Sequence, residues 1–206
     1  MFRFLDLPPE LRDRVYSFVT SDLGSQSLAF FKPPPITRVS KAVRSESLAV
    51  LFAEGITHVI VGSDLFHRER VLRGLPSTYV SSGLGSLDLH PIVERCICSA
   101  KSSALFRNVT FDVHHPGVFR HGPGRALWDN SLQLATLKLH VKNGFLTVQE
   151  RSANACYKFA EPSTEADVQA ALDVVVQVAE EIASRDQFSG FTLEDLKAVA
   201  SRIHFL

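Results

Sequence analysis

The amino-acid sequence predicts an α+β fold with an N-terminal helical pair, a central antiparallel sheet and two C-terminal helices. Two proline-led helical segments open the chain, alternating apolar residues fill its middle, and two capped apolar stripes close it. Strands and helices do not alternate regularly, which argues against a doubly wound parallel sheet.

Length and composition indicate one domain, or one domain with an extension. The order of the predicted elements divides the chain into a helical region (1–55) and an α+β platform (56–206), which are expected to pack as one compact unit. Of the 206 residues, 45% are hydrophobic and 21% charged, and the formal net charge is zero. This neutral balance gives no reason to expect nucleic acid or an anionic membrane as a partner. The three cysteines form no disulfide framework, and the apolar runs are too short for a membrane span. We expect an intracellular protein, cytoplasmic or nuclear, without a cofactor.

The first helix is predicted to begin at Pro9, since proline suits the first helical position. Glu10 follows in the first turn, where a negative charge is favourable. One apolar stripe has helical spacing and consists of Leu11, Val15, Phe18 and Val19. A helix this short needs a surface to pack on. That surface is either the chain itself or another protein.

The second helix is predicted from about Pro35 to about Ala53, ended by Gly55. Its apolar face comprises Ile36, Val39, Val43, Val50 and Leu51. Between the two helices, residues 28–31 form a candidate short strand.

The middle of the chain is predicted to supply the sheet. Residues 57–61 and 109–113 have strand patterns, whereas 64–73 form a weak helix and 76–89 a loop. The sequence around Asn143-Gly144 predicts a hairpin with a two-residue turn, which places Val141 opposite Leu146 and Leu139 opposite Val148. Residues 157–159 add a further candidate strand.

The end of the chain is predicted to be helical, in two pieces. Thr164 with Asp167, and Thr192 with Asp195, have the spacing of capping boxes. Gly190 separates the two helices. Phe191 and Leu196 fit a hydrophobic staple around the second cap. The buried stripes are predicted to be Val168, Leu172, Val175, Ala179 and Ile182, then Leu193, Leu196, Ala200 and Ile203.

Two segments resemble the fungal F-box-like family. Residues 5–16 read Leu-Asp-Leu-Pro-Pro-Glu-Leu-Arg-Asp-Arg-Val-Tyr, and residues 39–46 read Val-Ser-Lys-Ala-Val-Arg-Ser-Glu. The resemblance covers the first quarter of the chain and extends loosely to the strand at 108–112. It implies a non-enzymatic adaptor that binds a Skp-type subunit of a cullin–RING ubiquitin ligase and recruits an unknown client protein. The partner-binding residues it implies are Leu7, Pro8, Leu11, Val15, Phe18, Val39 and Val43.

Two other functions and two other candidate sites compete with this reading. The helices are either adaptor-binding or part of the chain's own core, in which case the protein is an interaction module and a candidate homo-oligomer. A small enzyme ranks last, because no nucleophile or nucleotide motif stands out. A basic ridge of Arg38, Lys41 and Arg44 is read as a solvated face. Zinc binding by Cys96 and Cys98 with His114 and His115 is disfavoured by the cysteine spacing.

Overall fold

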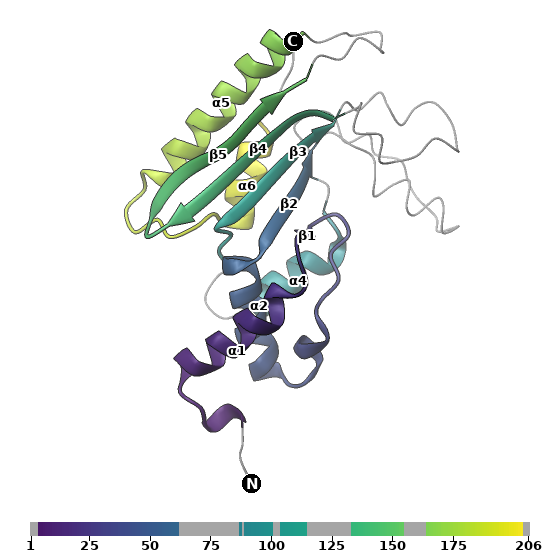
Figure 1. The fold of residues 1–206 in the computed structure, drawn as a ribbon, viewed down its shortest axis with the longest axis vertical. Helices are drawn as coiled ribbons and strands as arrows, with labels where there is room; N and C mark the ends of the chain where they lie inside the picture. Colours follow the sequence, from purple (N-terminus) through teal and green to yellow (C-terminus); the bar gives the residue numbers. More distant parts are fainter. Residues whose placement is uncertain are drawn as a thin grey trace, which may run out of the picture.

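The computed structural model describes residues 4–61, 87, 89–100, 104–114, 133–154 and 164–203. It is mixed α+β, with helices at both ends of the chain and a five-stranded sheet between them, as predicted (Figure 1). The predicted helix at 64–73, most of the predicted loop at 76–89, and the candidate strand at 157–159 lie outside the described residues. No helix in the described part of the chain is long and apolar enough to cross a bilayer.

The N-terminal region contains a 3₁₀ turn, η1 (Phe4–Asp6), and helix α1 (Pro9–Ser21). Strand β1 (Gln26–Ser27) follows, and the predicted strand at 28–31 is instead a bend and a turn. A second 3₁₀ turn, η2 (Pro35–Arg38), precedes α2 (Lys41–Glu54). The second helix therefore starts later than predicted, because the Ser40 hydroxyl caps it by accepting a hydrogen bond from the Val43 amide at 3.2 Å.

The sheet has the order β1-β2-β3-β4-β5. Its longer strands are β2 (Ile56–Val61), β3 (Asn108–His114), β4 (Gln133–Lys142) and β5 (Phe145–Ala153). Strands β3, β4 and β5 are antiparallel as predicted, but β1, β2 and β3 are mutually parallel, so the sheet is mixed. The reason is that α2 connects β1 to β2, and helix α4 (Pro91–Ser99) lies between β2 and β3, as crossover connections require.

The predicted hairpin and its register are confirmed. Asn143 and Gly144 have φ angles of 52° and 81°, which a type I′ turn requires. Leu139 pairs with Val148 and Val141 pairs with Leu146. The turn chemistry and the apolar alternation thus agree on one alignment.

One face of the sheet carries the main core. Alternate residues of β3 and β4, including Phe111 and Leu137, are fully buried beneath α5 (Glu165–Ala183) and α6 (Leu193–Ala200). Both predicted capping boxes are present, and every residue of the two predicted stripes is buried. In Figure 1 both helices lie behind the sheet, so the opposite face of β2 to β5 is turned to the viewer.

Helix α2 belongs to two cores. Leu48, Leu51 and Phe52 enter the main core, while Val43 and Val50 join a smaller cluster with Tyr16 of α1. Helix α1 is thus attached to the rest of the molecule largely through α2. Figure 1 shows α1, α2 and η2 extending beyond the sheet toward the N-terminal end.

Candidate functional site

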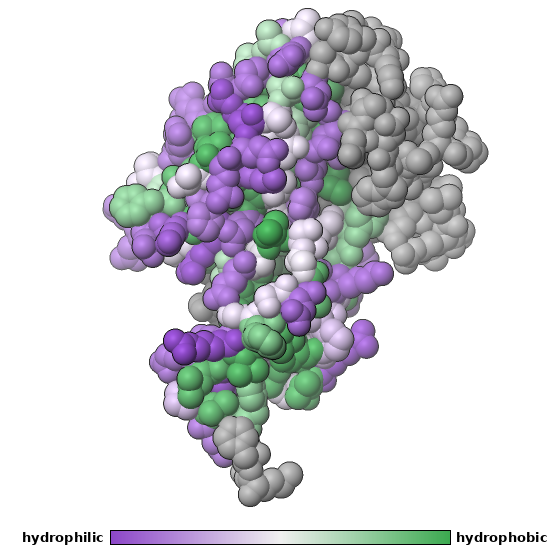
Figure 2. All heavy atoms as spheres, in the orientation of Figure 1, coloured by the Kyte–Doolittle hydropathy of each residue, from purple (hydrophilic) through white to green (hydrophobic). Residues whose placement is uncertain are grey.

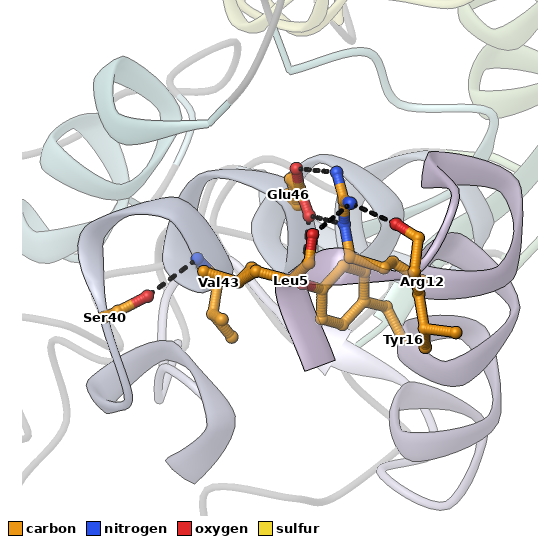
Figure 3. Close-up of polar contacts among 7 residues, drawn as sticks. Leu5, Arg12, Tyr16, Ser40, Val43 and Glu46 are labelled. Carbon is orange, nitrogen blue, oxygen red and sulfur yellow. Dashed lines mark hydrogen bonds and ion pairs between the residues drawn. The ribbon is translucent and has the colours of Figure 1, made fainter. Parts of the chain in front are cut away.

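The two sequence segments that resemble the F-box-like family meet in space through an ion pair. Arg12 of the first segment binds Glu46 of the second through one edge of its guanidinium, with Nε donating to Oε2 at 2.9 Å and Nη2 donating to Oε1 at 2.8 Å (Figure 3). Only 12% and 13% of the two side chains is exposed. A bidentate contact of this kind fixes the relative orientation of the two side chains as well as their distance.

Arg12 also orders the chain before α1. Its Nη1 donates to the carbonyl oxygens of Leu7 at 2.5 Å and Leu5 at 3.2 Å. One guanidinium therefore holds the N-terminal turn, α1 and α2 together. The hydrogen bonds between Arg12 and the Glu46 carboxylate, together with the negative charge of that carboxylate, raise the pKa of Arg12.

Tyr16 completes the contact between the helices. Its side chain is fully buried, its hydroxyl donates to Glu46 Oε2 at 3.0 Å, and its ring meets Phe4 edge-on at a centroid distance of 5.6 Å. Burial, followed by the hydrogen bond to Glu46, raises the pKa of Tyr16 to about 12.

The buried phenol gives a pH prediction. The folded-state pKa of Tyr16 lies above the ordinary value of 10.0, so its stabilising effect is complete below pH 10.0 and is lost as pH rises toward about 12. The chain has three tyrosines. In an ultraviolet absorbance titration, we expect the difference between the unaltered protein and Tyr16→Phe to show one tyrosinate transition near pH 12. A difference transition near pH 10.0 would contradict the buried hydrogen bond.

The inward face of α1 is consequently not its apolar one. Arg12, Tyr16 and Thr20, spaced four residues apart, face α2 and are buried or nearly so. The apolar stripe points away, with 45% of Leu11, 40% of Val15 and 74% of Phe18 exposed. Figure 2 shows hydrophobic residues gathered at the end of the molecule formed by the N-terminal helices, whereas the open sheet face is mostly hydrophilic. We call Leu11, Val15 and Phe18 the α1 apolar face.

The remaining predicted partner-binding residues are distributed differently. Pro8 is exposed and Leu7 is half-buried, both at the start of α1. Val39 is 72% exposed just before α2. Val43 is only 4% exposed and packs in the cluster with Tyr16, so in this structure it contacts the chain's own helix α1 and not the surface. Val43 belongs to the apolar side of α2 that packs against α1.

The structure does not bring the basic ridge or the described zinc candidates together into a site. Arg44 Nε donates to the Thr37 carbonyl oxygen at 2.8 Å and so fastens η2 to α2, while Arg38 and Lys41 are exposed. Cys96 is buried and Cys98 exposed, on different sides of α4, and His115 lies outside the described residues. Within the described ranges, no group of His, Cys, Asp or Glu is arranged to hold a metal ion.

A polar chain crosses the open face of the sheet. His58 Nδ1 lies 2.6 Å from Asp112 Oδ2, and Gln133 Nε2 donates to the other carboxylate oxygen at 3.0 Å. These contacts connect β2, β3 and β4 through their side chains and fix the orientation of the His58 imidazole. We read it as cross-strand stabilisation.

Sequence reasoning missed Arg12, Tyr16 and Glu46 as a unit. The available signal was the four-residue spacing of Arg12, Tyr16 and Thr20, which makes a second, polar stripe along α1. It was overlooked because the apolar stripe beside it is the more usual buried face. Comparison with protein-family models, with curated proteins and with solved structures found no match to this chain.

Proposed function

We propose that this protein is a non-enzymatic adaptor that uses the α1 apolar face to bind another protein, with a Skp-type subunit of a ubiquitin ligase as the partner. The observation that carries the proposal is the orientation of α1: a polar face is held inward and Leu11, Val15 and Phe18 are left in solvent. Apolar residues gathered on a protein surface commonly mark an interaction site.

The proposed contact is a helix face in a partner groove. Anchors one and two turns apart, such as Leu11, Val15 and Phe18, fit that mode of recognition. The bidentate contact between Arg12 and Glu46 favours binding because it fixes the helix before the partner arrives, which lowers the entropy cost of association. The sheet and its C-terminal helices then serve as the platform that holds a client near the ligase.

A matched pair of variants tests this proposal. Phe18 and Phe145 are 74% and 77% exposed, but Phe145 lies at the tip of the β4–β5 hairpin, away from α1. We expect Phe18→Asp to weaken binding to a purified Skp-type adaptor at least about tenfold, as loss of a central anchor does. Isothermal titration calorimetry on the full chain measures the change.

Phe145→Asp should bind as the unaltered protein does. Both side chains are solvated, so both variants should remain folded, with Phe18→Asp melting about 1–3 °C lower because it places a negative charge in the last turn of α1. Failure of the unaltered chain to bind the adaptor would overturn the ligase assignment. Equal effects of the two substitutions would overturn the assignment of the contact to α1.

A further inference from the structure

A hollow that does not include the α1 apolar face lies between the C-terminal ends of α1 and α2. It has a volume of about 340 Å³ and is lined by Ser17, Thr20 and Ser21 of α1 and by Glu54, Gly55 and Ile56 at the junction of α2 and β2. The α1 residues come from the last turns of that helix, and Glu54 is the last residue of α2. The C-terminal ends of both helices therefore converge on one site.

The hollow carries negative charge that no nearby basic residue of α1 or α2 offsets. A helix C-terminus carries partial negative charge that a cation normally offsets, yet neither α1 nor α2 has a basic residue in its last turn. Glu54 is exposed and forms no ion pair with the other residues that the structure describes.

The hydroxyls of Thr20 and Ser21 in the hollow already donate their hydrogens within α1. Thr20 Oγ1 donates to the Ser17 carbonyl oxygen at 3.1 Å, and Ser21 Oγ donates to the Phe18 carbonyl oxygen at 2.7 Å. Since each hydroxyl has only one hydrogen to donate, its oxygen lone pairs are what remain for a further contact. Acceptors and negative charge together suit a cationic group.

A second depression lies next to the hollow and shares Ile56 with it. Ile56 lines both the hollow and a groove of about 520 Å³ that passes over the open face of the sheet beside His58, Asn108 and Thr110. Ile56 is 50% exposed, although it is a large apolar residue at the start of a strand. The path is thus negative at one end, apolar at Ile56 and polar along the strands.

We infer that this path binds an extended segment of a partner protein that carries an arginine or lysine next to an aliphatic residue. The cationic side chain enters the hollow between the two helix ends and pairs with Glu54. The aliphatic side chain packs on Ile56, and the backbone continues over the sheet. The site is distinct from the α1 apolar face, so it holds whether or not the protein binds a ubiquitin-ligase adaptor.

A charged probe and its neutral analogue test the inference. We would titrate the full ¹⁵N-labelled chain with acetyl-Ile-Arg-amide and with acetyl-Ile-citrulline-amide, which has nearly the same shape without the charge. The arginine probe should cause saturable shifts of the Gly24, Gly55 and Ile56 amides, weakened by added salt. Equal shifts with the citrulline probe, or none with either, would overturn the inference.

Two variants of Glu54 complete the test. Glu54→Gln should weaken binding of the arginine probe about three- to fivefold, as loss of an exposed ion pair does. Glu54→Lys should abolish binding, and it should raise the melting temperature by about 1–3 °C because it supplies the cation that both helix ends lack. Unchanged binding in Glu54→Gln would refute the pairing, and a lower melting temperature in Glu54→Lys would refute the negative character of the hollow.

Discussion

Replacement of Glu46 by leucine is expected to release α1 from the molecule. The substitution leaves the Arg12 guanidinium nearly buried without the two carboxylate contacts at 2.8 and 2.9 Å, and it removes the acceptor of the Tyr16 hydroxyl. Loss of one partner from a largely enclosed ion pair is destabilising, because the remaining charge keeps no counter-ion. Because α1 packs in the small cluster with Val43 and Val50, and not in the main core, the sheet should remain folded.

Hydrogen exchange measures this release. In Glu46→Leu, we expect the amides of α1 to lose protection while those of β3 and β4 keep theirs. The double variant Arg12→Met with Glu46→Leu should recover part of the loss, since an apolar pair replaces the ion pair without stranding a charge. Unaltered protection of α1 in the single variant would show that the ion pair does not hold the helix.

Truncation of Phe106 is expected to destabilise the whole platform. This residue is fully buried, lies with its ring centroid 5.2 Å from that of Phe52 in α2, and exchanges two backbone hydrogen bonds with Phe191 just before α6. It therefore joins the N-terminal and C-terminal helices at the end of the sheet. Phe106→Ala should lower the free energy of unfolding by about 3–5 kcal/mol, the cost of a cavity of this size.

Urea denaturation gives the test, with Phe106→Leu as the control. The leucine variant keeps most of the buried volume and should lose only about 1 kcal/mol. A small effect of Phe106→Ala, close to that of the leucine variant, would contradict the place of this ring in the main core.

The parts of the fold that could be predicted are those with strong local signals. The Asn143-Gly144 turn and the flanking alternation specify the same register, because the turn type fixes the pairing and the alternation fixes the face. Thr164 and Thr192 mark helix starts through contacts that span only three residues. Such features depend little on the rest of the chain.

The parts that could not be predicted depend on distant contacts. Strand β1 has two residues, too few for a pattern, yet it makes the first parallel pairing with β2. Helix α4 was missed, although Pro91 at its start and the buried Val93 and Cys96 gave a weak signal. Without β1 and α4, the two parallel pairings could not be recognised, and the sequence predicts only an antiparallel sheet.

In the candidate site, too, the local pattern could be predicted and the contact between distant residues could not. The apolar stripe of α1 could be predicted from its spacing, but not the side on which it would lie. That side is decided by Glu46, which is 34 residues from Arg12 in the sequence. A single bidentate contact across this separation turns the polar stripe inward, and no local propensity indicates it.

The orientation of α1 is the central claim, and solvent paramagnetic relaxation of methyl groups tests it most directly. With a soluble gadolinium chelate added to the full chain, the methyl signals of Leu11 and Val15 should broaden strongly, since 45% and 40% of these side chains are exposed. Those of Val43 and Leu48, which are 4% and 0% exposed, should be protected. Protection of Leu11 and Val15 equal to that of Leu48 would mean that α1 buries its apolar face and would contradict the account.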